Sequence, residues 1–325
     1  MTFKRLLPAL ALVATLAFVV AACGDDEDEG NGAASGNPPE EQELSGEIRI
    51  DGSSTVYPFA QAAAELFMEE NNGVRITVGQ SGTGGGFEKF CAGETDISDA
   101  SRPIDEEEEV PICEENGVEF TEVQVANDGI AIATNPSLEI PCLTTDQLKS
   151  LWEPNSKVQS YIDLDPSFPD TEVSLFGPGT DSGTFDFFTD TINGEEGASR
   201  EDYEASEDDN QLVTGVTGTE NGLGYFGLSY LEQNADQLNA VEVDGGDGCV
   251  APSSETVQDG SYKPLSRPIF MYPSAEAMAK PHVKAFMEFI VENHQAIAEA
   301  AAIVPMTEEQ AAEASSALQS VGGGA

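Results

Sequence analysis

Three clusters of glycine and hydroxyl residues each follow a β-like run of the sequence and precede a helix-like run. They are Gly52–Thr55, Ser81–Gly86 and Gly179–Thr184. A helix start leaves backbone N–H groups free where the helix dipole is positive, hydroxyls add donors, and glycine lets the backbone approach a ligand closely. One such junction is usually only a helix N-cap. Three of them together indicate a site that holds a dehydrated oxyanion with many neutral donors.

Catalytic and metal chemistry has little support in the other residues. Asp181-Ser-Gly-Thr184 matches one half of an aspartic protease site, but that chemistry needs two such carboxylates and the chain has no second copy. The two histidines, His282 and His294, fall on one amphipathic helix predicted around Val283–Ile290, where we expect solvent exposure. Two histidines on one helix do not build the metal cluster of a phosphohydrolase, and the cysteine spacings match no zinc signature. We therefore expect no cofactor, no metal and no enzymatic activity.

The elements that position the clusters alternate between short β-like and helix-like runs from Glu47 onward. This alternation predicts an α/β fold with a largely parallel sheet, whose ligands bind at the carboxyl ends of strands. The helix after the first cluster tolerates Pro58 in its first turn. After the second cluster, Phe87 and Phe90 are expected to open a short helix. Trp152 is interpreted as a packing residue of a helix rather than a stacking platform.

The N-terminus has the features of an export signal over residues 1–22. Lys4 and Arg5 precede a short apolar run that ends in Ala21-Ala22-Cys23. A basic start, a short apolar stretch and small residues at the cut are typical of a signal peptide, and the run is short for a bilayer span of about 20 residues. Cysteine after two alanines is similar to the bacterial lipobox, in which Cys23 is lipidated. A plain signal peptide and an uncut anchor helix are the alternatives.

The mature chain is long enough for two domains and strongly acidic. Sixty acidic residues against 13 basic ones give the whole chain a net charge of −47. Such a surface repels nucleic acid and offers no basic face to anionic lipid, so membrane contact is expected through the N-terminal lipid only. A salt-rich external medium explains this charge best. Residues 23–45, which are acidic and poor in large apolar side chains, are predicted to be a disordered tether.

Four cysteines follow Cys23. An even number in an exported chain favours disulfides, and four cysteines allow three pairings. We favour Cys91–Cys113 with Cys142–Cys249, because this pairing keeps the first bridge local.

Several motifs together resemble the PstS-type phosphate-binding proteins, the substrate-binding components of bacterial ABC phosphate transporters. They occur in the same order as in that family, from about Gly46 to Leu318. The segments that carry the resemblance are Asp51-Gly-Ser-Ser-Thr-Val-Tyr-Pro58, Gly79–Phe87, Asp96–Ile104, Leu143–Trp152, Asp181-Ser-Gly-Thr184, Asn221–Phe226 and the segment at Pro305.

The resemblance implies a two-lobed α/β fold of the periplasmic-binding-protein type II class. Two hinge-crossing strands are expected near Val125–Ile132 and Pro264–Met271, with lobe 1 formed by residues 46–125 and 266–325 and lobe 2 by residues 126–265. The implied function is binding of inorganic phosphate outside the cytoplasmic membrane and delivery to an ABC permease, by a lipid-anchored monomer. The alternatives are another oxyanion, namely sulfate, arsenate or molybdate, and an envelope phosphohydrolase.

The resemblance also implies the residues of the binding site. The chain departs from the family pattern at two positions. Pro178 stands where many members have an Arg that offsets the charge of the anion, and Ser101 stands where many have an Asp that accepts the proton of the phosphate. Arg102 is the expected cation, with a surface pairing to Asp105–Glu109 as its alternative, and Asp181 is the candidate proton acceptor. The full implied set is Ser54, Thr55, Val56, Thr83, Gly84, Ser101, Arg102, Asp181, Ser182, Gly183 and Thr184.

Overall fold

The structure, a computed structural model, describes residues 43–180 and 182–321. Its first part alternates strands with helices, and β1 pairs in parallel with both β2 and β3. The helix α2 begins at Gly82, so the glycine run forms its first turns. The expectation that Phe87 opens this helix is therefore wrong. The elements are β1 (Gly46–Gly52), α1 (Tyr57–Glu70), β2 (Val74–Val78), α2 (Gly82–Cys91), β3 (Ile97–Ala100) and α3 (Val110–Glu115).

A second group of elements follows β4 (Val123–Thr134). Within it β6 pairs in parallel with β7 and β8, and β9 pairs with β5 and β10. The elements are β5 (Cys142–Thr144), α4 (Thr145–Trp152), the 3-10 turn η1 (Tyr161–Asp163), β6 (Ser174–Pro178), α5 (Gly183–Phe188), the π-helical turn η2 (Thr189–Asn193), β7 (Glu204–Ser206), α6 (Asp209–Gly218), β8 (Gly222–Gly227), α7 (Leu228–Gln233), β9 (Asn239–Asp244), β10 (Cys249–Val250) and α8 (Ser254–Gln258).

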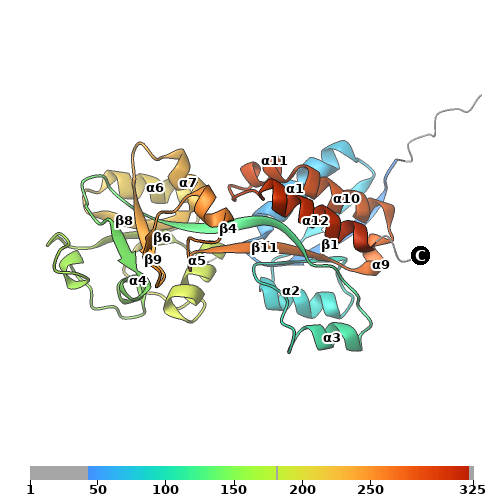
Figure 1. Cartoon of the computed structure of the whole chain (residues 1–325), viewed down its shortest axis with the longest axis horizontal. Coiled ribbons are helices and arrows are strands. Elements are labelled where there is room, and N and C mark those ends of the chain that lie inside the picture. Colours follow the sequence, from blue (N-terminus) through green and yellow to red (C-terminus); the bar gives the residue numbers. More distant parts are fainter. Residues whose placement is uncertain (1–42, 181, 322–325) are drawn as a thin grey trace, which may run out of the picture. The chain divides into compact units, whose positions relative to one another are not determined.

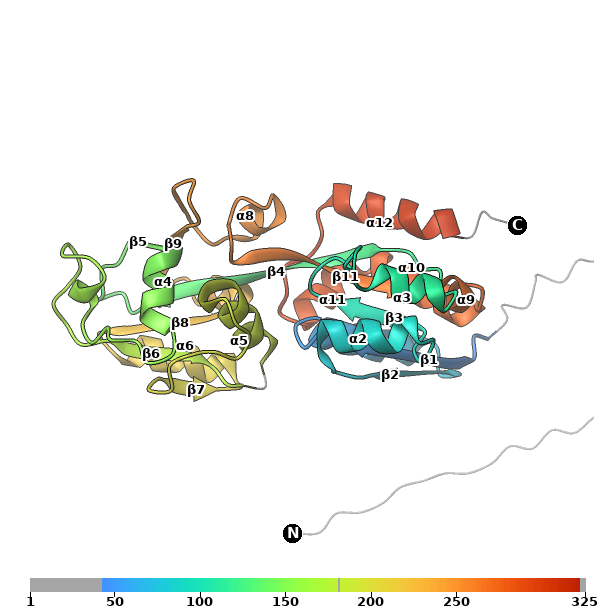
Figure 2. The same cartoon turned by 90° about the horizontal axis from the view of Figure 1, so that it is seen from below.

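The two groups are joined by a pair of long antiparallel strands, β4 and β11 (Ser266–Pro273), which run side by side in Figures 1 and 2. The main path of the sheet is β2-β1-β3-β11-β4-β8-β6-β7. Because β4 leaves the first group and β11 returns to it, these two strands are antiparallel to each other. In addition, β11 is antiparallel to β3 and β4 is antiparallel to β8. The sheet is therefore mixed, and the prediction of a largely parallel sheet is wrong at these central strands.

Two large apolar cores lie on either side of this strand pair. One is formed by residues between Ile48 and Ala126 together with residues between Ile269 and Leu318. The other is formed by residues between Ile130 and Leu265, with Val304 added. The C-terminal helices cover the first group, opposite α2 and α3 (Figure 1). These helices are α9 (Ala275–Met278), α10 (Pro281–Glu292), α11 (His294–Ala300) and α12 (Glu308–Val321).

Two sequence-based expectations about large side chains had different outcomes. Trp152 is fully buried among aromatic rings, as its interpretation as a packing residue requires. The prediction for His294 is wrong: it starts a separate helix, α11, and is only 7 % exposed. Burial lowers the pKa of its imidazole. Among the described residues, we find no helix with the length and apolarity needed to cross a membrane.

The structure contains two disulfides, Cys91–Cys113 with a Cα–Cα distance of 4.2 Å and Cys142–Cys249 with one of 6.1 Å. This is the pairing that we favoured from the sequence. The first disulfide links the end of α2 to α3, and the second links β5 to β10.

Removing the Cys91–Cys113 bridge is expected to lower the free energy of unfolding by about 3 kcal/mol. The bridge spans 22 residues, and a cross-link of this length restricts the unfolded chain by that amount in the loop-entropy account. Urea unfolding of the Cys91→Ser/Cys113→Ser double variant measures the loss, with the non-reduced wild type as reference. Equal unfolding midpoints with equal slopes would show that the bridge does not stabilise the fold.

Candidate functional site

The first and third donor clusters are in direct contact through Thr55. The Thr55 hydroxyl donates to the carbonyl oxygen of Gly183 at 3.1 Å and accepts from Arg267 Nη2 at 2.7 Å. Beside it, the Ser54 hydroxyl donates to Asp186 Oδ2 at 3.0 Å. These bonds bring together segments that are far apart in the chain.

The helix starts at these clusters differ in how their N–H groups are satisfied. Val56 precedes α1 and Ser81 precedes α2, and neither accepts a capping hydrogen bond with its side chain. At α5, by contrast, the Ser182 hydroxyl accepts from the Thr184 N–H at 3.2 Å. The starts of α1 and α2 thus lack the side-chain cap that normally satisfies such donors, which suits them to an anion.

Two cavities adjoin Thr55. The first, which we call the Thr83 cavity, has a volume of about 390 Å³. The second, which we call the Ser182 cavity, has a volume of about 410 Å³. Ser54 and Thr55 line both. The predicted residues are therefore divided: Thr83, Gly84, Ser101 and Arg102 line the Thr83 cavity, and Ser182, Gly183 and Thr184 line the Ser182 cavity.

One other predicted residue, Val56, lines neither of these two cavities. Val56 is fully buried, and its part in the site is limited to the backbone at the start of α1. Asp181, the candidate proton acceptor, lies outside the described residues. The assignment of Asp181 as the proton acceptor therefore stays a prediction.

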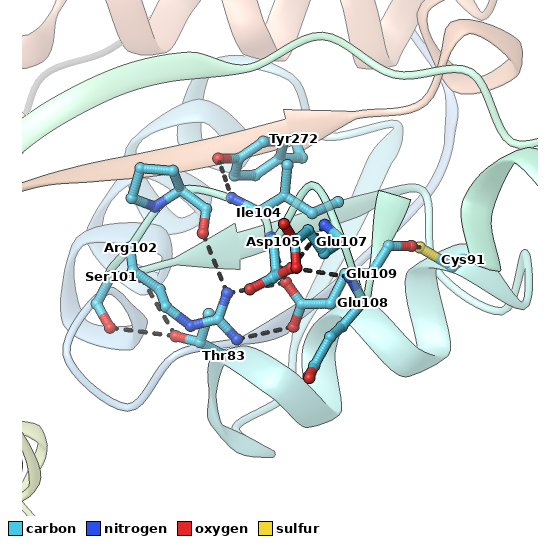
Figure 3. A network of polar contacts seen from close by, with 11 residues as sticks. Thr83, Cys91, Ser101, Arg102, Ile104, Asp105, Glu107, Glu108, Glu109 and Tyr272 are labelled. Atoms are coloured by element: carbon cyan, nitrogen blue, oxygen red, sulfur yellow. Dashed lines mark hydrogen bonds and ion pairs between the residues drawn. The ribbon is translucent and has the colours of Figure 1, made fainter. Parts of the chain in front are cut away.

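The second cluster is tied to the loop after β3. Thr83 and Ser101 share a hydrogen bond between their hydroxyls at 3.1 Å, and the Ser101 N–H donates to Thr83 Oγ1 at 3.3 Å (Figure 3). Ser101 is buried, with 8 % of its surface exposed. This pair fixes the start of α2 against the end of β3, so both hydroxyls face the Thr83 cavity together.

Arg102 lines the Thr83 cavity but is also paired with an acidic turn. Its Nη1 and Nη2 donate to the two carboxylate oxygens of Glu109 at 2.8 and 2.7 Å, and Nη1 also donates to the carbonyl of Pro103 (Figure 3). The side chain is 45 % exposed, and the hydrogen bond with Glu109 raises the pKa of the guanidinium. For Arg102 to bind an anion with its fork, it must first leave Glu109.

Arg267 is a cation of the cavity that the sequence analysis missed. It lies on β11, lines the Thr83 cavity, and its guanidinium carbon lies 3.6 Å from the centre of the Phe187 ring. Its side chain is 20 % exposed, and its Nε lies 3.4 Å from Asp128 Oδ2. The only available signal was an arginine inside an expected crossing strand, in a chain with 13 basic residues.

Acidic groups oppose these cations. Asp186, Asp190 and Glu196 line the Thr83 cavity, and burial, followed by the charges of the two aspartates, raises the pKa of Glu196. Beneath the first cluster, Asp99 is fully buried and burial raises the pKa of its carboxyl well above the usual range.

Comparison with known proteins gives the family. A family model described as "PBP superfamily domain" matches residues 37–294. The phosphate-binding protein PstS of Staphylococcus epidermidis is 37 % identical over 88 % of this chain and 84 % of its own length. The chain belongs to the PstS-type phosphate-binding proteins. Another relative of this PstS-type chain, protein SphX of a Synechocystis species, is 45 % identical over 81 % of the chain and 79 % of its own length.

A solved structure agrees with the architecture of this PstS-type protein. The crystal structure of a possible phosphate-binding protein from Planctomyces limnophilus superposes with a TM-score of 0.80 at 39 % identity, covering 86 % of this chain and 99 % of that one. The fold is the two-lobed periplasmic-binding-protein fold, with β4 and β11 as the crossing strands. In this member the position of the family arginine is Pro178, whose carbonyl accepts from the Tyr203 hydroxyl at 2.9 Å.

Proposed function

We propose that this protein binds inorganic phosphate outside the cytoplasmic membrane and delivers it to an ABC permease. It acts as a monomeric binding protein and not as an enzyme. The observation that carries the proposal is the convergence at Thr55 of two cavities, the uncapped start of α1 and a partly buried arginine, Arg267. Membership of the PstS-type proteins, whose named relatives are phosphate-binding proteins, supports the same ligand.

The anion is held mainly by neutral donors. The positive dipole ends of α1 and α2 face the anion, and the backbone N–H groups at these helix starts donate to it. The hydroxyls of Thr55 and Thr83 add further donors. Ser182, Gly183 and Thr184 contribute from the other side, through the Ser182 cavity. Because the hydroxyls of Thr55 and Thr83 are already paired in this structure, the anion must exchange with their internal partners.

The proposed lobes keep the boundaries expected from the resemblance. Lobe 1 comprises residues 46–125 and 266–325, and lobe 2 comprises residues 126–265. The division of the buried side chains into two cores supports these limits, because the cores separate near Ala126 and Leu265. Lobe closure over the anion then involves bending at β4 and β11, the two strands that run from one core to the other.

Titration of the purified protein, freed of endogenous ligand, tests the function. Phosphate at 100 times its Kd is expected to stabilise the fold by about 2.7 kcal/mol, seen as a raised unfolding temperature. Sulfate, arsenate and molybdate are compared by calorimetry under the same conditions. Tighter binding of one of these anions would replace phosphate as the ligand, and an unmoved melting curve with all four would overturn anion binding.

A variant pair links the binding to Thr55. Thr55→Val keeps the shape but removes the hydroxyl that bonds Arg267 and Gly183, and we expect phosphate affinity to fall about tenfold. Thr217→Val is the matched control, because the Thr217 hydroxyl donates to the Val213 carbonyl within α6 and lines neither cavity. Equal losses of phosphate affinity in both variants would show that Thr55 does not take part in binding.

Lipid anchoring at Cys23 is part of the proposal, although Cys23 lies outside the described residues. We expect mass spectrometry of the native protein to find a diacylglyceryl group on an N-terminal Cys23, because the preceding residues match a lipobox. Cys23→Ser should move the protein from the membrane fraction to the soluble fraction. A wild-type protein that is soluble and cut at another residue would contradict the anchor.

A further inference from the structure

We propose that Arg267 supplies the positive charge that binds the anion, and that Asp128 holds this arginine in place on the crossing strands. The inference rests on the proposed function and adds a binding residue to it. Arg267 and Asp128 are direct partners in the register of β11 and β4. They lie between the two cores, since Ala126 and Ile269 belong to one core and Ile130 and Leu265 to the other.

The contacts of Arg267 reach both groups of elements. Its Nη2 donates to Thr55, at the start of α1, and its guanidinium carbon lies 3.6 Å from the centre of the Phe187 ring of α5. A guanidinium has five N–H donors. Hydrogen bonds to Thr55 and Asp128 use two of them among the described residues. Further donors therefore remain for a ligand in the Thr83 cavity, which Arg267 lines.

The pairing of Arg267 with Asp128 is weaker than that of a completed buried ion pair. Only Nε contacts the carboxylate, at 3.4 Å. Arg200, whose side chain is buried, instead makes two bonds to the exposed carboxylate of Asp202, at 2.7 and 2.9 Å. Charge-assisted bonds normally have lengths of about 2.7–2.9 Å. Asp128 therefore orients Arg267 without occupying its fork, and leaves it able to take an oxyanion.

The charge around the cavity gives this arginine its importance. The chain carries a net charge of −47, and Asp186, Asp190 and Glu196 line the same cavity. An incoming anion needs a local cation to offset this field. Arg102, the other arginine of the cavity, has its fork on Glu109 and is 45 % exposed to screening water, whereas Arg267 is 20 % exposed. A less exposed cation acts on the anion with less screening.

The experiment measures phosphate affinity by calorimetry at about 50 and about 500 mM salt, a range over which screening changes strongly. The variants are Arg267→Gln, Arg267→Lys and the double variant Asp128→Asn/Arg267→Gln. The double variant removes both charges, so it leaves no buried carboxylate unpaired and keeps the test valid if Arg267→Gln alone fails to fold. Arg49→Gln is the control for the change in net charge. It leaves Asp96 paired, because Lys280 Nζ lies 2.7 Å from the other carboxylate oxygen of Asp96.

We expect Arg267→Gln and the double variant to bind phosphate about 10- to 100-fold more weakly than wild type, the value of a charge-assisted bond. Arg267→Lys keeps the charge without the fork and should lie between them and wild type. Because the acidic field remains, added salt should lower the phosphate affinity of both charge-removed variants less than that of wild type, a difference that a purely structural role of Arg267 does not produce. Arg49→Gln should stay within about threefold of wild type.

Two outcomes overturn different claims. If wild type binds phosphate and the double variant matches its affinity, Arg267 only neutralises Asp128 and the inference is wrong. If wild type does not bind phosphate at all, the proposed function fails and this inference fails with it.

Discussion

Replacing Gly183 with alanine is expected to weaken phosphate binding by about 10- to 100-fold, the equivalent of a small-to-large clash in a packed site. A Cβ at this position would lie 2.4 Å from the backbone nitrogen of Thr55 and 2.7 Å from the carbonyl carbon of Ser54. These are backbone atoms and cannot rotate away. The methyl group would push α5 from the start of α1 and break the bond between the Thr55 hydroxyl and the Gly183 carbonyl.

The matched control for this variant is Gly218→Ala. Gly218 ends α6 in the same group of elements, and a Cβ there meets no atom within 4 Å. Calorimetry with phosphate on both variants, together with their unfolding temperatures, separates a local clash from a general loss of stability. If Gly183→Ala binds phosphate as tightly as Gly218→Ala, close contact between these two clusters is not needed for binding.

Replacing Trp152 with alanine is expected to lower the free energy of unfolding by about 3–5 kcal/mol, the range for loss of a large core aromatic. The side chain is fully buried. Its ring packs edge to face against three other aromatic rings. The distances between ring centres are 4.8 Å to Tyr225, 5.5 Å to Tyr203 and 5.8 Å to Phe188. Alanine would leave a cavity among three aromatic rings, one of which belongs to α5.

Urea unfolding measures this loss, and Trp152→Phe is the control because it keeps an aromatic ring in the same space. The indole Nε1 has no hydrogen-bond partner among the described residues, so phenylalanine loses packing volume but no polar contact. We expect the phenylalanine variant to lose less than half as much stability as the alanine variant. A loss below about 1 kcal/mol in Trp152→Ala would mean that the surrounding rings collapse into the space.

Local chemistry made several features of this protein readable before the structure. Pro58 lies in the first turn of α1, as its fixed φ allows. The hydroxyl and glycine clusters lie at the starts of α1, α2 and α5. A helix start can be predicted from the sequence because it depends on the few residues next to it, whose hydroxyls cap the helix and whose glycines allow the turn. The order of the motifs along the chain then indicated the family.

Other features depend on contacts that no local pattern reports. The cavity residue Arg267 meets Thr55 across 212 positions of sequence, and Ser54 meets Asp186 across 132. The sequence predicted one site from three clusters, whereas the structure divides their residues between two cavities that share Ser54 and Thr55.

The sequence by itself therefore determined which segments place hydroxyl and glycine residues at helix starts, which cysteines pair, that Trp152 is a packing residue, and which family the chain resembles. Only the tertiary structure decided that the central strands run antiparallel, that Arg102 is held by Glu109, and that Arg267 contacts Thr55 and lines the Thr83 cavity. The physical reason is the sequence separation of the interacting residues. The residues that cap a helix start are neighbours in the chain, whereas the position of a charged side chain depends on how the two crossing strands bring distant parts of the chain together.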